Sequence, residues 1–170
     1  SLFSHLDYIG LRAEEPRRAI VGMEASITGN MIVPQIHNQP YYNKPPVFNW
    51  VLVAFFEMFS SFEEWIVRLP GILSLLAISI LNFFLARRYI NREAALLSTL
   101  LFLISGDILF YASVNAGEID LFYTLLVFLQ ITSIFVFSQK GKYLHMFLFS
   151  YFFAAIGLLT KGLPSVAFQG

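Results

Sequence analysis

Four long runs of apolar residues, separated by short charged turns, constrain this chain more than any other feature of its sequence. Three runs, Leu69–Ala86, Leu121–Gln139 and Tyr143–Thr160, contain no Asp, Glu, Lys or Arg, and the fourth, Ala94–Val114, contains only Asp107. A helix needs about 17–25 residues to cross the hydrocarbon core of a bilayer. We therefore expect an all-α integral membrane protein, a multi-span helical bundle with spans at about residues 66–86, 94–114, 121–138 and 143–160.

The composition supports a membrane protein and excludes several other classes. Hydrophobic residues make up 57% of the chain, aromatic residues 17% and charged residues only 13%, which is more apolar surface than a soluble chain of this size could cover. The 11 basic and 11 acidic residues balance, so the charge gives no attraction to nucleic acid. The chain has no cysteine, which excludes disulfides, a thiol nucleophile and cysteine-based metal sites.

The charges in the turns alternate and so predict the topology. Arg87, Arg88 and Arg92 fill the first turn, residues 115–120 carry two acids, and Lys140 and Lys142 fill the third turn. Lys and Arg are retained on the cytoplasmic side of a membrane. This rule places residues 1–65 and the acidic turn on the periplasmic or extracellular face of the cell membrane.

Residues 1–65 are expected to form an outer-face loop with amphipathic interfacial helices at about residues 15–28 and 47–62. Pro16 follows two acids, as is typical of a helix start, and Gly29 provides a natural end. The second segment is apolar but short. If it crossed the membrane, both basic turns would face outward, against the positive-inside rule, so we interpret it as an interfacial helix.

The predicted topology gathers acids and cations on one face of the membrane. Taken singly, each has a structural explanation: Asp120 suits a helix N-cap, and Lys161 suits a helix C-terminus. Asp107 differs, because an ionisable side chain inside a span is a functional candidate by default. Together, acids beside cations at a membrane surface suit chemistry on a phosphate-linked lipid. Taken singly, Arg17 and Arg18 would be surface partners of the two N-terminal acids, and Glu63 and Glu64 would be solvated. The members of this set are Glu14, Glu15, Arg17, Arg18, Lys44, Glu63, Glu64, Asp107, Glu118, Asp120 and Lys161.

Three stretches resemble the first outer loop of the GT-C glycosyltransferases, in the order found in that family. They are Glu14–Ala19 (Glu-Glu-Pro-Arg-Arg-Ala), Gly29–Pro34, and Tyr41–Trp50, which contains Asn-Lys-Pro-Pro. The most similar branch is family 39, which includes protein O-mannosyltransferases and the bacterial aminoarabinose transferase. The family has a span before this loop and many spans later, so we expect the chain to be the N-terminal part of a longer polypeptide.

The resemblance implies a role for each matching residue. Glu14 stands at the catalytic acid position and would act as general base, with Glu15 able to share or take that role. Asp120 matches the second acid, near the reaction centre, and a divalent metal ion there is left open. Lys44 and Arg17, and less strongly Lys161, would bind the donor phosphate, while Glu118 and Asp107 would be auxiliary.

The expected function is transfer of a sugar from a polyprenyl-phosphate donor, such as an undecaprenyl-phosphate sugar, to an acceptor lipid, protein or glycan on the outer face. A phosphate leaving group needs no proton, so one carboxylate base suffices and attack from the opposite face inverts the anomeric centre. Two alternatives stay open. One is a transporter, with Asp107, Glu118 and Asp120 as an ion or proton relay; the other is a non-catalytic membrane subunit.

Overall fold

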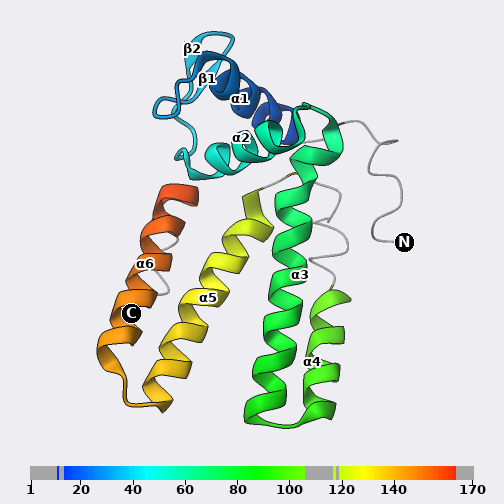
Figure 1. Cartoon of the computed structure of the whole chain (residues 1–170), viewed down its shortest axis with the longest axis vertical. Coiled ribbons are helices and arrows are strands. Elements are labelled where there is room, and N and C mark those ends of the chain that lie inside the picture. Colours follow the sequence, from blue (N-terminus) through cyan, green and yellow to red (C-terminus); the bar gives the residue numbers. More distant parts are fainter. Residues whose placement is uncertain (1–10, 12–13, 106–116, 118, 164–170) are drawn as a thin grey trace.

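The computed structural model describes residues 11, 14–105, 117 and 119–163, and the statements below refer to those residues. The chain forms a head segment, which contains α1, a β-hairpin with two residues in each strand, and α2, and a bundle of four helices, α3 to α6 (Figure 1). The elements are α1 (Glu15–Thr28), β1 (Gln35–Ile36), β2 (Gln39–Pro40), α2 (Val47–Phe59), α3 (Glu64–Tyr89), α4 (Arg92–Leu103), α5 (Ile119–Gln139) and α6 (Tyr143–Lys161).

The bundle confirms the expected all-α, multi-span fold. Three helices, α3, α5 and α6, are long and apolar enough to cross a membrane, judged by length and composition. The fourth, α4, is shorter than the expected span at 94–114, since it ends at Leu103 and is followed by non-helical Ser105. A glycine comes next in the sequence, and glycine weakens a helix interior. The rest of that expected span, residues 106–114, lies outside the described residues.

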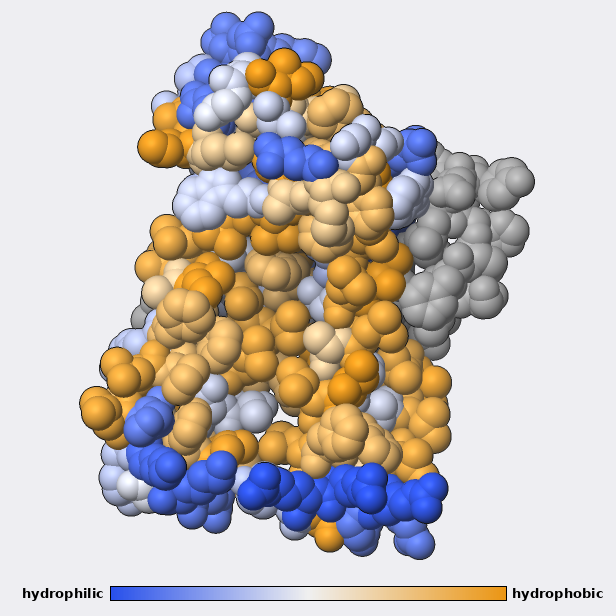
Figure 2. Space-filling model, viewed as in Figure 1, coloured by the Kyte–Doolittle hydropathy of each residue, from blue (hydrophilic) through white to orange (hydrophobic). Residues whose placement is uncertain are grey.

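The basic turns lie together at the end of the bundle that is far from the head segment. The α3–α4 and α5–α6 turns are both at the bottom of Figure 1, with the head segment at the top. Figure 2 shows a hydrophilic band along this basic end, and a largely hydrophobic surface between the band and the head segment. The exposed cations of the turns are Arg87, Arg88, Arg92, Lys140 and Lys142. The alternation of charges in the sequence therefore correctly indicates that the α3–α4 and α5–α6 turns lie at the same end of the bundle.

The head segment packs as two helices on a shared apolar core. Pro16 stands at the start of α1, where its missing N–H costs nothing. A Cβ added to Gly22 in α1 would lie 3.1 Å from Cβ of Leu52, so glycine there allows α1 and α2 to approach closely. The same core includes Ile66 of α3 and Ile119 of α5. It therefore fixes the head segment to the bundle as well as α1 to α2.

A second apolar cluster holds α3 and α5 together just below the head segment. Ile72 and Leu75 of α3 pack with Leu121 of α5, and all three are buried. Further from the head segment, the Asn82 side chain of α3 donates hydrogen bonds to two α4 hydroxyls, at 3.2 Å each. The first turn of α5 is thus held beside α3, on the side of the head segment, and this arrangement brings the ends of several elements to one place.

Candidate functional site

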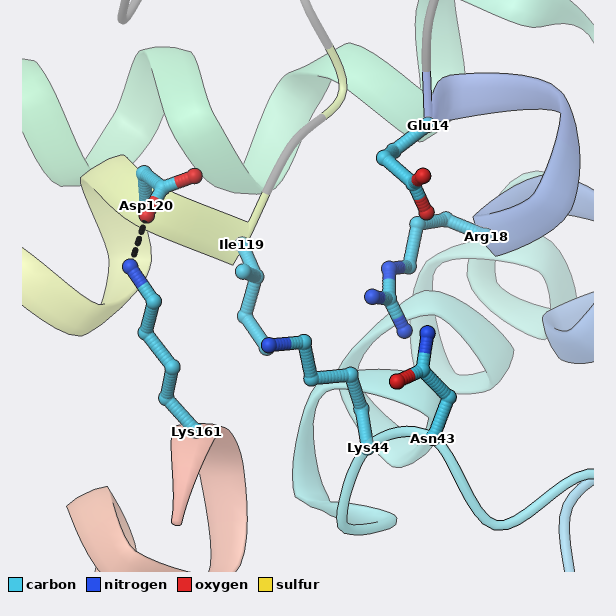
Figure 3. Close-up of a pocket in the computed structure, with 7 residues that line it drawn as sticks. All are labelled: Glu14, Arg18, Asn43, Lys44, Ile119, Asp120 and Lys161. Atoms are coloured by element: carbon cyan, nitrogen blue, oxygen red, sulfur yellow. Dashed lines mark hydrogen bonds and ion pairs between the residues drawn. The ribbon is translucent and has the colours of Figure 1, made fainter. Parts of the chain in front are cut away.

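A pocket of about 280 Å³ lies where the head segment meets the ends of α5 and α6 (Figure 3). Four of its lining residues come from the head segment and three from the bundle. They are Glu14, Arg18, Asn43, Lys44, Ile119, Asp120 and Lys161. Four of the residues that the sequence suggested, Glu14, Lys44, Asp120 and Lys161, therefore lie around one space, although they span almost 150 positions of the chain.

Glu14 lines the pocket from the position just before α1, and Arg17 holds its carboxylate. Nη1 of Arg17 donates to both carboxylate oxygens of Glu14, at 2.8 Å each, and both side chains are about half exposed. A hydrogen bond with Tyr41, and then the charge of Glu14, raise the pKa of the Arg17 guanidinium. Arg17 does not itself line the pocket. The sequence predicted that it binds phosphate, whereas its contact in the structure is with Glu14.

Two cations face the pocket with no charged partner. Arg18 is only 3% exposed, and Lys44 is partly buried in the loop before α2. Within the described part of the chain, neither side chain makes a hydrogen bond or an ion pair. Figure 3 shows Glu14 and Arg18 at the start of α1, and Asn43 and Lys44 on the loop that precedes α2, all four on one side of the pocket. A guanidinium that is largely shielded from solvent, opens only onto a pocket and has no ion-pair partner among the described residues attracts negative charge, so this part of the pocket favours an anion.

The opposite wall of the pocket is formed by an ion pair between α5 and α6. Nζ of Lys161, in the last turn of α6, donates to Oδ1 of Asp120, in the first turn of α5. The side chains are 29% and 39% exposed, respectively. Nζ of Lys161 also lies 5.3 Å from the ring centroid of Tyr123, a cation–π distance. The charge of Lys161 is therefore already balanced, unlike the charges of Arg18 and Lys44.

Glu15 does not line the pocket but points into the interior. It is fully buried, and its carboxylate accepts hydrogen bonds from Nε and Nη2 of Arg68 at 3.0 and 3.2 Å, and from the N–H of Gly117. Neighbouring side chains on a helix point about 100° apart, so one of the two adjacent acids faces the pocket and the other faces the interior. Of the two, only Glu14 is placed to meet a ligand in the pocket.

The remaining site predictions are not covered by the structure. Asp107 and Glu118 lie outside the described residues. Across the ranges that are described, no three His, Asp or Glu side chains gather into a group that could hold a metal ion. A metal at Asp120 therefore stays a prediction.

The sequence assigned no role in the site to three of the lining residues: Asn43, Ile119 and Arg18, the last of which belongs to the outer-face set. One signal could have found Arg18. It follows Glu14 by four positions, and side chains four apart lie on the same face of a helix. Asn43 is adjacent to Lys44 in the Asn-Lys-Pro-Pro stretch, but adjacency does not predict that both side chains reach one pocket. Ile119 is an ordinary apolar residue, and nothing in its local sequence indicates a site.

Comparison with known proteins gives consistent results. The model of the dolichyl-phosphate-mannose-protein mannosyltransferase family matches residues 43–167. An undecaprenyl phosphate-alpha-4-amino-4-deoxy-L-arabinose arabinosyl transferase from Erwinia tasmaniensis is 29% identical over 178 residues, which cover 98% of this chain and 32% of the relative. The chain thus spans about a third of the length of this curated relative.

Two crystal structures of ArnT from Cupriavidus metallidurans share the fold. The apo structure matches with a TM-score of 0.81 and the structure bound to undecaprenyl phosphate with 0.82, both at 23% identity. Each match covers 98% of this chain and 31% of the other. The family match extends over most of the chain, from the Asn-Lys-Pro-Pro loop through α6. The resemblance to GT-C glycosyltransferases is thereby confirmed, and the chain belongs to the dolichyl-phosphate-mannose-protein mannosyltransferase family.

Proposed function

We propose that this chain carries the active site of a glycosyltransferase that moves a sugar from undecaprenyl phosphate to an acceptor. One observation carries the proposal: Glu14 lines one pocket together with two cations, Arg18 and Lys44, that make no ion pair among the described residues. The pocket lies at the junction of the head segment and the bundle, and Figure 2 shows hydrophilic atoms on the head segment and a largely hydrophobic surface on the bundle. A lipid-linked phosphate needs that junction, because its chain stays in the membrane while its phosphate meets polar groups.

The assignment of phosphate-binding residues follows from which cations are already paired. Arg17 is bound to Glu14 and Lys161 to Asp120, so neither has its full charge available. Arg18 and Lys44 do. A phosphate oxygen would give the buried Arg18 the partner that it lacks, and hydrogen bonds between charged groups are about twice as strong as neutral ones. We therefore assign the donor phosphate to Arg18 and Lys44, and the holding of the Glu14 carboxylate to Arg17.

The reaction then follows from these positions. The Glu14 carboxylate takes the proton of the acceptor hydroxyl as its oxygen forms a bond to the anomeric carbon of the sugar. The bond between that carbon and the phosphate oxygen breaks, and its electron pair leaves with the phosphate. The charge that develops on the phosphate is stabilised by Arg18 and Lys44. Attack opposite to the leaving group inverts the anomeric centre, and no second acid is required.

We place this pocket on the extracytoplasmic side of the cell membrane. The exposed cations of the two turns lie at the opposite end of the bundle (Figure 1), and the positive-inside rule assigns that end to the cytoplasm. The acceptor would then be a lipid, a protein or a glycan of the cell envelope. The pocket accepts any hydroxyl that reaches Glu14, so the class of acceptor has to come from experiment.

The test is sugar transfer by the full-length protein in membrane vesicles. Radiolabelled undecaprenyl-phosphate 4-amino-4-deoxy-L-arabinose is supplied in one reaction and undecaprenyl-phosphate mannose in another, and the products are separated into lipid, protein and glycan fractions. Glu14→Gln keeps the shape of the side chain and removes the base, so we expect turnover to be lost while binding of the donor is retained. Lys44→Ala should weaken donor binding, and Asp120→Asn should release Lys161.

The control variant is Lys142→Ala, which removes an exposed cation at the basic end, far from the pocket. It should transfer sugar like the wild type. Wild-type transfer by Glu14→Gln, Lys44→Ala and Asp120→Asn together would show that the pocket is not the active site. A transporter or a non-catalytic subunit would then be the better description.

A further inference from the structure

A buried ion pair joins three separate segments next to the pocket. The side chains of Glu15 and Arg68 are each 1% exposed, and Nε and Nη2 of Arg68 contact the two different carboxylate oxygens of Glu15 at 3.0 and 3.2 Å. Glu15 is the first residue of α1, and Arg68 lies in the second turn of α3. This pair therefore fixes both the position and the direction of the start of α1 on the bundle, because a forked guanidinium aligns both oxygens.

The same carboxylate also holds the chain that leads into α5. The N–H of Gly117 donates to Oε1 of Glu15. A Cβ on Gly117 would lie 2.7 Å from Cγ1 and 3.0 Å from the backbone oxygen of Val67, so this backbone is pressed against α3 immediately beside Arg68. Two and three residues later, Ile119 and Asp120 line the pocket.

The contacts among Glu15, Arg68 and Gly117, called the joint below, therefore adjoin the residues of both walls of the pocket. On one side, Glu15 is covalently next to Glu14; on the other, Gly117 leads into Asp120. Neither Glu15 nor Arg68 lines the pocket. We propose that Arg68, acting through Glu15, is a positioning residue that sets the distance between Glu14 and the start of α5. The inference rests on the function proposed above.

The energetics of buried ion pairs support a role in geometry. Replacing such a pair with packed apolar groups is often neutral or stabilising, so stability alone is a weak reason to keep one. In a bidentate pair whose carboxylate also accepts a backbone N–H, each hydrogen bond has a fixed direction, whereas an apolar contact has none. Directional control matters where a base must reach a hydroxyl, because a shift of about 1 Å in a reacting group can cost roughly 100-fold in rate.

The first test is Arg68→Lys in the full-length protein, assayed for transfer from undecaprenyl-phosphate 4-amino-4-deoxy-L-arabinose, or from the mannose donor if only that one is used. Lysine keeps the positive charge but offers one point donor in place of the fork. We expect kcat to fall by roughly 100-fold, with KM for the donor changed by no more than about threefold, since uniform binding is little affected. The matched control is Ile78→Val, another buried change in α3 but away from the joint, which should leave kcat unchanged.

The second test separates positioning by Glu15 from catalysis by Glu15. Glu15→Gln keeps the length of the side chain and an oxygen for Arg68 and Gly117, whereas Glu15→Asp keeps the charge but withdraws it by one methylene. A positioning residue should retain more kcat as Gln than as Asp. A general base would show the opposite order. The double variant Glu15→Gln/Arg68→Gln leaves no unpaired buried charge. It is assayed in place of any single variant that fails to fold. Its kcat should be lower than that of the wild type.

The outcomes are distinguishable from those of the proposed function. If Glu14→Gln abolishes transfer but Arg68→Lys, or the double variant in its place, has wild-type kcat, the positioning inference is wrong and the active site stands. If Glu15→Asp is more active than Glu15→Gln, Glu15 acts in catalysis and the inference is likewise overturned. If Glu14→Gln transfers sugar normally, the proposed site itself fails. Folded protein is quantified for each variant by size-exclusion chromatography in detergent.

Discussion

Gly117→Ala is the most demanding single change that the structure suggests, because it adds one methyl group where there is no room for it. The new Cβ would lie 2.7 Å from Cγ1 of Val67, 3.2 Å from its carbonyl carbon and 3.0 Å from its carbonyl oxygen. Val67 is 1% exposed and belongs to the core shared by the head segment and the bundle. The methyl group can therefore be accommodated only if α3 and the lead-in to α5 move apart.

The expected cost is that of overpacking a core, about 1–3 kcal/mol. In a protein of roughly 150–250 residues, each kcal/mol lowers the melting temperature by about 2–4 °C. The movement also lengthens the bond from the Gly117 N–H to Glu15, so sugar transfer should fall together with stability. The assay is thermal unfolding in detergent, followed by the fluorescence of the two tryptophans, of which Trp65 is two residues from Val67.

A double-mutant cycle tests the physical reason. Val67→Ala removes the side-chain atom that the added methyl group meets, so Gly117→Ala should cost less in that background, with a coupling of about 0.5–3 kcal/mol. The backbone oxygen at 3.0 Å remains, and the rescue should therefore be partial. If Gly117→Ala leaves the melting temperature unchanged, or if the free-energy costs of the two substitutions simply add, the close packing of Gly117 against Val67 is refuted.

Three further predictions concern single side chains. Arg18→Met should raise the melting temperature of the ligand-free protein, since it removes a buried charge without a partner among the described residues, and should weaken donor binding; equal donor affinity would contradict the assignment of the phosphate. Lys44→Ala should raise KM for the donor roughly 10- to 100-fold, the value of a hydrogen bond to a charged group, whereas Lys142→Ala should leave KM unchanged. Glu24 accepts hydrogen bonds from two N–H groups in the hairpin turn, so Glu24→Gln should cost roughly 1 kcal/mol and speed amide exchange there, without changing transfer.

The sequence predicted the fold well where a physical rule acts locally. Apolar runs bounded by charged turns identified α3, α5 and α6 to within about three residues, because crossing a membrane requires a minimum length. Proline and glycine marked both ends of α1, since each acts through its own backbone. For the expected span at 94–114, α4 covers the part up to Leu103, and residues 106–114 lie outside the described residues.

The site was predictable only in part, because partners far apart in the chain leave no local trace. Glu14 and Glu15 are neighbours with the same chemistry, and only the rotation of α1 decides which one meets the pocket. In the structure, Glu15 is paired with Arg68, 53 positions away in the chain. Arg18 looked like a surface partner of the acids, yet the packing of α1 buries it. Residue type indicates which chemistry is available, and tertiary contacts decide which residue reaches the pocket.

The composition of the pocket has a consequence for the synthesis of the protein. Its lining begins at Glu14 and ends at Lys161, the last residue of α6. In a growing chain, the residues that line one side of the pocket are therefore made long before Asp120 and Lys161, which form the opposite wall. Until α6 has been inserted and its C-terminal end has reached α5, there is no enclosed space in which a donor could be held. Completion of the bundle, more than folding of the head segment, is the event that creates the site.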